Sequence, residues 1–254
     1  FSGQVSSDQT WFADTVKVYG YVQVNDGVTL TINKGTVVQF QGPYLLNVMG
    51  TLKAIGTDNE MVIFTCVPVS IESGWRGITF HNLGSMNDND TSIIRYCKIN
   101  YAKNDMGGGI RVYDFSKLRI ENSWFENNEA EEYGGAIYCN FCGPLIRHNT
   151  IINNTAKRGG GIASDHAFPD IIGNTIAYND ASDIADGIFL WFSNSRLDGN
   201  LISNHEVAIE GWGGNARQFA QNPAHTATSE GRLGGCSVAG FPARQQSDRR
   251  ASAD

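Results

Sequence analysis

The chain has 254 residues, of which 41% are hydrophobic and 18% charged, with 29 glycines and 6 prolines. Its formal net charge of −7 argues against a nucleic-acid partner, and no apolar run approaches the roughly 20 residues of a membrane-spanning helix. We therefore expect a substantial buried core, no nucleic-acid partner and no membrane insertion. The start at FSGQVSSDQT, without Met or a signal peptide, is typical of a processed chain.

Short strands are expected throughout the N-terminal third. Residues 15–42 alternate apolar and polar side chains, and the alternation breaks at the turn sequences Asn25-Asp26-Gly27 and Lys34-Gly35. The segment SGWRGITF predicts a further strand at Ile78. We expect residues 1–20 to form an N-terminal cap region of one domain that spans residues 1–214.

A polar segment at residues 81–93, HNLGSMNDNDTSI, is expected to loop out of the fold. Its acidic and amide side chains could ligate calcium, although no correctly spaced glutamate follows, and a solvated loop is the favoured interpretation. These side chains belong to Asn87, Asp88, Asn89 and Asp90. We expect no other cofactor.

The five cysteines do not form a disulfide framework, because their number is odd. Cys139 and Cys142 form a CxxC pair that could be half of a zinc site, but no second pair exists. We interpret Cys139 as a small buried residue, with a bridge to Cys142 left open.

A repeat of about 25 residues occupies the centre of the chain. The segments MGGGIRVYD, YGGAIYCNF, RGGGIASDH, ADGIFLWF and the weaker EVAIEGW each contain one isoleucine in the same place. These are Ile110, Ile137, Ile162, Ile188 and Ile209, at steps of 27, 25, 26 and 21 residues. Asparagines recur in phase at Asn122, Asn149, Asn174 and Asn200, with Cys97 in the same position one repeat earlier.

This period, with short apolar runs and no helical pattern, predicts an all-β, right-handed parallel β-helix of roughly eight coils with three short strands per coil. Stacked asparagines would hydrogen-bond from coil to coil and accept left-handed turns. The repeat isoleucines should form one inward stack. A second should contain Ile99, Trp124, Ile151, Ile176 and Ile202.

The last forty residues lack both the repeat and strand alternation. They carry five arginines and no lysine, unlike the rest of the chain. We expect residues 215–254 to be an irregular, disordered or non-native tail.

The segments LTINKGTVVQFQGPYLLNVMGTLKAIGT and GWRGITF resemble the amino-terminal half of secreted right-handed parallel β-helix proteins of Bacteroidota and related bacteria. NTIINNTAKRGGGI resembles their repeats. The resemblance covers roughly residues 11–212 and implies a secreted or cell-surface bacterial protein. The wider pectate-lyase-like superfamily contains lyases, hydrolases, tailspikes and adhesins, but none of their catalytic signatures matches here. No catalytic site is therefore carried over.

Function in such a fold belongs to outward side chains, which stacking aligns into rows. The first and third residues after each repeat isoleucine should point outward. The first set is Arg111, Tyr138, Ala163, Phe189 and Glu210, and the second is Tyr113, Asn140, Asp165, Trp191 and Trp212. Aromatic rings beside hydrogen-bonding groups suit extended sugar chains, although the rings could equally lie under loops or simply favour strands.

Catalysis would need paired carboxylates, or a carboxylate with a base. The best cluster is Asp165, His166 and Asp170, with Lys157 and Arg158 nearby. We place this cluster one coil from Asp114 and consider Asp114 or Glu210 as the second carboxylate. Asp165 is nevertheless the only acid in its column, so the pattern favours a non-catalytic role.

Three hypotheses follow. The first is an extracellular or cell-surface module that binds polysaccharide along the aromatic and charged face, with Lys157 and Arg158 among the contacts. The second is a polysaccharide lyase or glycoside hydrolase that acts on an acidic glycan. The third is a structural or adhesin spacer. The pattern favours the first.

Overall fold

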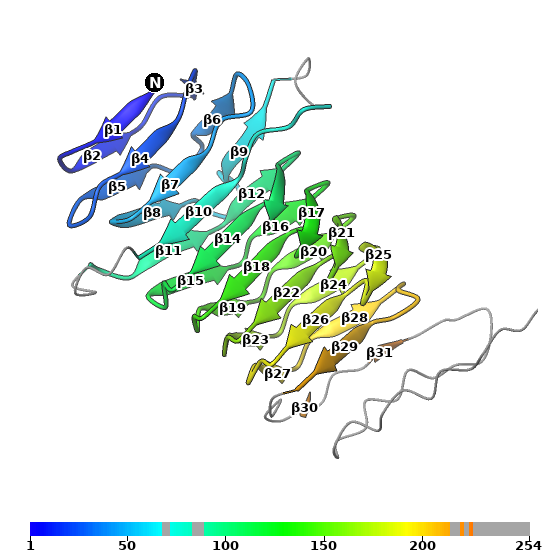
Figure 1. Cartoon of the computed structure of the whole chain (residues 1–254). Coiled ribbons are helices and arrows are strands. Elements are labelled where there is room, and N and C mark those ends of the chain that lie inside the picture. The colour runs from blue at the N-terminus through cyan, green and yellow to red at the C-terminus, as the bar shows by residue number, and fades with distance from the viewer. Residues whose placement is uncertain (68–71, 83–88, 214–218, 221–223, 226–254) are drawn as a thin grey trace, which may run out of the picture.

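The protein is a parallel β-helix, shown by a computed structural model that describes residues 1–67, 72–82, 89–213, 219–220 and 224–225. Each coil contributes one strand to each of three sheets, and every pairing is parallel. The sheets have nine strands each, close to the predicted coil number, and no helix occurs among the described residues. Figure 1 shows the strands stacked along one axis from the N-terminus.

Sheet A contains β1 (Gly3–Val5), β4 (Val22–Val24), β7 (Leu46–Val48), β10 (Ile78–His81), β14 (Ile110–Tyr113), β18 (Ile137–Asn140), β22 (Ile162–Asp165), β26 (Ile188–Trp191) and β29 (Ile209–Trp212). Sheet B contains β2 (Gln9–Trp11), β5 (Thr29–Ile32), β8 (Thr51–Ile55), β11 (Ser92–Arg95), β15 (Leu118–Glu121), β19 (Leu145–Arg147), β23 (Asp170–Ile172), β27 (Arg196–Asp198) and β30 (Phe219–Ala220).

Sheet C contains β3 (Thr15–Val18), β6 (Val37–Phe40), β9 (Val62–Cys66), β12 (Cys97–Asn100), β16 (Trp124–Glu126), β20 (Thr150–Ile152), β24 (Thr175–Ala177), β28 (Leu201–Ser203) and β31 (Ala224–His225). A fourth sheet, which the sequence did not predict, contains β13 (Lys103–Met106), β17 (Glu129–Tyr133), β21 (Thr155–Arg158) and β25 (Asp180–Ile184). It lies between sheets C and A in chain order.

The ends of the predicted domain differ from expectation. Residues 1–20, expected as a cap, contain β1 to β3 and form the first coil. Beyond residue 214, β30 and β31 pair with β27 and β28. The rest of the predicted tail lies outside the described residues.

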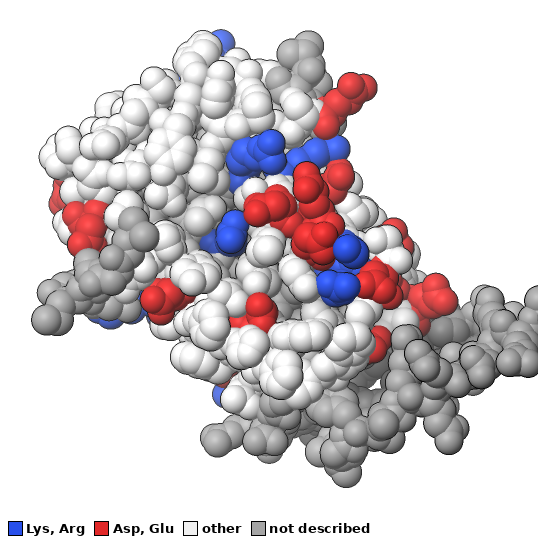
Figure 2. All heavy atoms as spheres, viewed as in Figure 1, with Lys and Arg blue, Asp and Glu red and all other residues white. Residues whose placement is uncertain are grey.

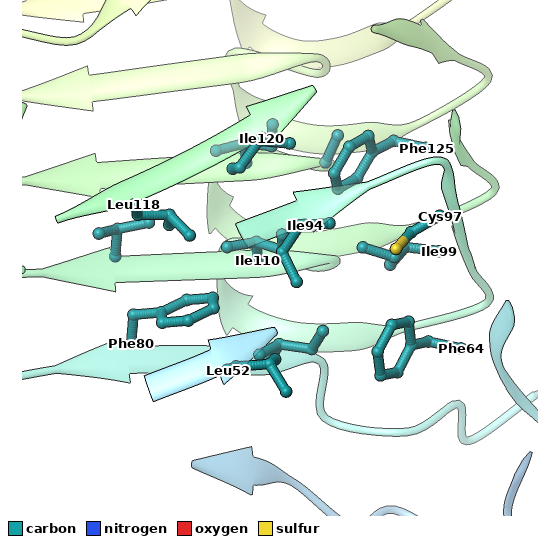
Figure 3. Packing of buried hydrophobic residues seen from close by; sticks show 14 of the residues in the cluster. Leu52, Phe64, Phe80, Ile94, Cys97, Ile99, Ile110, Leu118, Ile120 and Phe125 are labelled. Atoms are coloured by element: carbon teal, nitrogen blue, oxygen red, sulfur yellow. The ribbon is translucent and has the colours of Figure 1, made fainter. Parts of the chain in front are cut away.

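Inward side chains fill the centre of the helix in columns (Figure 3). Ile110, Ile137, Ile162 and Ile188 stand in register and are fully buried, as predicted, and Ile209 continues their column. The second stack required a correction. Phe125, not Trp124, pairs with Ile99 and Ile151 and is fully buried, whereas Trp124 points outward.

The same one-residue error affects the asparagine column. Ser123, not Asn122, follows Cys97 and precedes Asn149, whose side chain accepts a hydrogen bond from the Ser123 backbone N–H at 3.0 Å. The column then continues through Asn174 and Asn200 with amide hydrogen bonds of 3.0 and 2.9 Å. Serine fills this position because its hydroxyl also accepts a backbone N–H, that of Cys97.

The ladder asparagines do not themselves occupy the left-handed conformation. That conformation falls on the residue before each ladder position, which is Asn122 (φ 48°) before Ser123, then His148 (φ 54°), Gly173 and Gly199 before the asparagines. A second ladder, which the sequence did not predict, joins Asn128, Asn154, Asn179 and His205. Each ladder therefore closes a corner next to the coil's left-handed residue.

The glycines before Ile110, Ile137 and Ile162 have a separate cause, which the third of these repeats illustrates. Gly159 has φ 65°, which favours glycine. Gly160 has no positive φ, but an added Cβ would lie 2.4 Å from the backbone oxygen of Asp180 in the next coil. Close stacking of coils thus requires glycine at this position, as it does at the equivalent Gly108 and Gly135.

Candidate binding surface on sheet A

The strand register confirms both outward columns of sheet A. Arg111, Tyr138, Ala163, Phe189 and Glu210 pair from β14 to β29 and form the first column. Tyr113, Asn140, Asp165, Trp191 and Trp212 pair likewise and form the second column.

The fourth sheet covers much of the first column. Tyr133 of β17 stacks on Tyr138 and Phe189, with ring centroids 5.8 and 6.2 Å away. Both rings are almost fully buried, as is Asn140 in the second column. This corrects the expectation that the whole face is open to solvent, since these three side chains cannot be reached by a ligand in this arrangement.

An exposed aromatic row remains beside the covered part. It lies in the second column and at the corner where sheet A turns into sheet B. Tyr113, Phe141, Phe192 and Trp212 are 38–53% exposed. We define the aromatic row by these residues and two neighbours: Tyr113, Phe141, His166, Trp191, Phe192 and Trp212.

Successive rings of the aromatic row come from neighbouring coils and lie about one strand spacing apart. Phe141 stacks on His166 and His166 on Phe192, with centroids 5.4 and 5.2 Å apart, and Trp191 lies 5.3 Å from Trp212. The distances follow the strand spacing of about 4.8 Å. The rings therefore form a continuous strip along the helix axis.

Phe141 and Phe192 were missed by sequence reasoning. They occupy the fourth position after the repeat isoleucine, together with Asp114 and His166, and all four have a left-handed φ between 43° and 50°. A non-glycine residue in that conformation is strained, and bulky residues are rare there. Aligning the fourth position of each repeat would have revealed the rings.

Asp165 is held by three neighbours. Its Oδ2 accepts hydrogen bonds from the Tyr138 hydroxyl at 3.1 Å and the Asn140 amide at 2.9 Å, and its Oδ1 lies 2.6 Å from Nδ1 of His166. Burial, followed by the Asp165 carboxylate, raises the pKa of Tyr138 far above its usual value. Tyr138 therefore remains a hydrogen-bond donor that orients Asp165.

The predicted catalytic carboxylates do not converge. Asp114 directly follows β14, and Glu210 lies on β29. Each of these strands is two strands from β22, which carries Asp165, in sheet A. Asp114 is therefore two coils from Asp165, instead of the single coil expected. Two strand spacings are about 10 Å, at the upper limit for glycosidase carboxylate pairs, so the backbone does not place these acids side by side. Asp170 begins β23 in sheet B and so faces a different side.

The predicted cationic contacts lie in ion pairs (Figure 2). Lys157 and Arg158 of β21 pair with Glu132 and Asp183 at 3.3 and 2.9 Å. Arg111 pairs with Asp105 at 3.4 Å. Figure 2 shows the basic and acidic side chains interleaved over the fourth sheet, so these cations are already neutralised.

The structure describes only part of the predicted calcium loop. Asn89 donates to Asp26 and Met49, and Asp90 pairs with Lys53 at 3.1 Å, while Asn87 and Asp88 lie outside the described residues. Within the described part of the chain, no three His, Cys, Asp or Glu side chains gather as a metal site. The solvated loop remains the favoured interpretation, with calcium as the alternative.

The four described cysteines, including Cys139 and Cys142, are free and buried. A hydrogen bond with Cys142 and burial raise the pKa of the Cys139 thiol well above its usual value. Cys139 therefore remains a thiol and is a poor metal ligand, since thiolate is the binding form.

No helix in the described ranges is long and apolar enough to cross a membrane.

Comparison with known proteins supports the fold. Residues 69–176, which run from β10 into β24, match a family model described as a right handed beta helix region. The match agrees with the parallel β-helix and with its expected hand. No curated protein and no solved structure matches the chain.

Proposed function

We propose that this protein is an extracellular or cell-surface module that binds polysaccharide along the aromatic row. One observation carries the proposal: the row is a continuous strip of ring contacts along the helix axis, and all its rings except the half-buried Trp191 are exposed. The apolar C–H faces of sugars stack on such rings, and oriented polar groups bind the hydroxyls. Asp165 and Glu210 supply fixed acceptors next to the rings.

A hydrogen bond orients the Glu210 side chain beside the aromatic row. Its Oε1 accepts a hydrogen bond from Nε1 of Trp212 at 3.0 Å. The indole is thereby fixed beside the carboxylate. A preorganised ring loses little conformational entropy when a ligand binds, so Trp212 should contribute strongly to affinity.

Affinity electrophoresis through gels that contain soluble polysaccharides tests the proposal. Phe192→Ala or Trp212→Ala should weaken binding about tenfold, because each removes one stacking ring. Trp124→Ala is the matched control, since Trp124 is 42% exposed on sheet C, away from the row. Equal effects of Trp124→Ala and Trp212→Ala, or no retardation by any glycan, would contradict the proposal. The second result would favour the structural spacer.

A second candidate function is a lyase or hydrolase, and the Asp165–His166 contact of 2.6 Å is the observation that favours it. A carboxylate that orients an exposed imidazole is an arrangement used in general base catalysis. The ultraviolet absorbance of unsaturated uronates and a reducing-sugar assay test it. Cleavage that is lost in Asp165→Asn and His166→Ala would establish an enzyme, and binding without product would exclude one.

A location outside the cell is part of the same proposal. It rests on the resemblance to secreted bacterial β-helix proteins. Fractionation of source cells, followed by immunodetection in the medium and at the cell surface, tests it. Detection in the cytoplasm alone would contradict it.

A further inference from the structure

The outer face of the first four strands of sheet A carries no charged residue. Gln4, Gln23, Asn47 and Thr79 stand in register on β1, β4, β7 and β10, and these strands contain no Asp, Glu, Lys or Arg. We call these four residues, three with amide side chains and one threonine, the amide track. Figure 2 shows an uncharged area over these strands, in contrast to the charges over the fourth sheet.

The amide track continues directly into the candidate surface. Thr79 pairs with Arg111, which begins the first outward column, and His81 pairs with Tyr113 of the aromatic row. The His81 and Tyr113 rings also lie 5.1 Å apart. The amide track thus reaches the aromatic row through the contact of His81 with Tyr113, one column beside Arg111.

Hydrogen bonds orient two side chains of the track, those of Gln4 and Gln23. The Tyr21 hydroxyl donates to Gln23 at 3.1 Å, Gln23 donates to Asn25 at 3.0 Å, and Asn25 donates to Gln4 at 3.4 Å. Each amide has two N–H donors and an oxygen with two lone pairs, so each keeps further groups for a ligand. Oriented amides match sugar hydroxyls, which both donate and accept.

The charges farther along sheet A oppose an anionic ligand. Arg111 is the only Lys or Arg in the nine strands of sheet A, all of which lie within the described residues, and it already pairs with Asp105. Asp114, Asp165 and Glu210 stand beside the rings. A polyanion on this face would therefore meet like charges and no free cation on the strands.

We propose that the ligand is an uncharged polysaccharide that runs along the helix axis, from the aromatic row across the amide track. The inference rests on the proposed function and adds the ligand's charge and extent to it. From β29 to β1 the nine strands of sheet A span about 38 Å at their usual spacing. The ligand is thus a chain of many sugars, and its affinity should rise with length.

Paired polymers test the charge of the ligand. Neutral glucans, galactans, mannans and xylans would each be compared with a carboxylated or sulfated derivative in affinity electrophoresis. We expect retardation by a neutral polymer and at least tenfold weaker binding of its derivative. Tighter binding of the charged form, if Trp212→Ala abolishes it, would overturn this inference but keep the proposed function. Retardation by no polymer would overturn both.

The Trp212→Ala condition is needed because anions have another possible site. Arg95, Arg119 and Arg147 surround the buried Glu121 on sheet B, with nitrogen–oxygen distances of 3.9, 2.7 and 2.9 Å. A charged polymer held there would bind Trp212→Ala as well as the unmodified protein. That result would leave the neutral preference of sheet A supported.

Chain length tests the amide track. Gln23→Ala combined with Asn47→Ala should weaken binding of a long neutral polymer about threefold to tenfold and leave short oligosaccharides unaffected. Gln39→Ala is the matched control, because Gln39 lies on β6 of sheet C. If the double variant bound the long polymer as tightly as the unmodified protein does, the amide track would have no role in binding. A concentration-dependent dimer that the double variant abolishes in sedimentation velocity would also contradict that role, since the face would then bind a second copy.

Discussion

The first three coils and the later coils build the same three sheets with different corners. In β1, β4 and β7 the registered residues Gly3, Val22 and Leu46 are 19 and 24 residues apart, whereas the repeat isoleucines Ile110, Ile137, Ile162 and Ile188 are 27, 25 and 26 apart. Asparagine ladders close the later corners. The first coils are held by buried Val, Leu and Phe side chains.

This difference shows what imposes the repeat. A ladder amide must lie directly above its neighbour, because it bonds to the coils before and after it. A hydrophobic column has no such requirement, since dispersion and burial are not directional. The period therefore becomes regular where amide hydrogen bonds close the corners and is looser where only apolar packing does.

The largest expected effect is in the first coils. Phe64 is fully buried and stacks with Trp75, with ring centroids 6.3 Å apart. Phe64→Ala should lower the free energy of unfolding by about 4 kcal/mol, because it leaves a cavity in a core without polar support. Urea denaturation followed by circular dichroism measures this. A loss below about 1 kcal/mol would show that the first coils do not depend on this packing.

The next effect is in the ladder. Asn174 accepts from the backbone and side chain of Asn149 and donates to the Ile146 carbonyl. Asn174→Ala should lower the free energy of unfolding by about 3 kcal/mol, because several buried polar groups lose their partners. Gln39→Ala, outside the ladders, is the control and should change it by less than about 0.5 kcal/mol. Similar losses in both variants would contradict a role for the ladder.

Acid should weaken the end of the second ladder. Burial lowers the pKa of His205 from 6.5 to about 4, and its Nε2 accepts from the backbone N–H of Asn179 at 3.2 Å. The folded pKa lies below the unfolded one, so the unfolded state binds more protons as the pH falls from 6.5 toward 4. His205 should therefore remove about 2 kcal/mol of stability between about pH 7 and about pH 5.

His205→Asn is the matched control for this pH dependence. It restores the residue type of the ladder, keeps an acceptor for Asn179 and removes the titrating group. Denaturation of both proteins at the two pH values measures the difference. A pH dependence that His205→Asn leaves unchanged would assign the effect to other groups.

The smallest effect is expected at the aromatic row. Phe141→Ala and Phe192→Ala should each change the free energy of unfolding by about 1 kcal/mol or less, because both rings are half exposed and stack only at the corner. Phe12→Ala in the exposed N-terminal coil is the control. Thermal unfolding measures all three. A large loss would mean that the row is a structural element of the corner, and the binding variants would then need a different design.

Much of the fold and part of the site were predictable from sequence. The isoleucine column, the ladder of Asn149, Asn174 and Asn200 and the register of both outward columns of sheet A were confirmed. Asn122 and Trp124 were placed wrongly because the repeat changes its residue types there. Ser123 replaces a ladder asparagine and Phe125 replaces an isoleucine, so alignment by residue type slipped by one position.

The accessibility of the site was not predictable. The strands of the fourth sheet, such as Glu129–Tyr133 and Asp180–Ile184, are polar and lack clear alternation, so the sequence pattern does not identify them as strands. Their effect is large because Tyr133 covers Tyr138 and Phe189. The second ladder was missed for a related reason. Its asparagines lie next to these polar segments, and its last position is His205 instead of an asparagine.

The parallel β-helix and the outward columns of sheet A follow from the amino-acid pattern alone, because stacking converts a periodic pattern into columns and strand alternation sets their direction. Which of the outward side chains are exposed to solvent depends on tertiary packing. That depends on how a fourth-sheet side chain such as Tyr133 packs over sheet A, where it contacts Tyr138 of its own coil and Phe189 two coils later. Such contacts are set by packing between coils, and no local pattern in the chain encodes them.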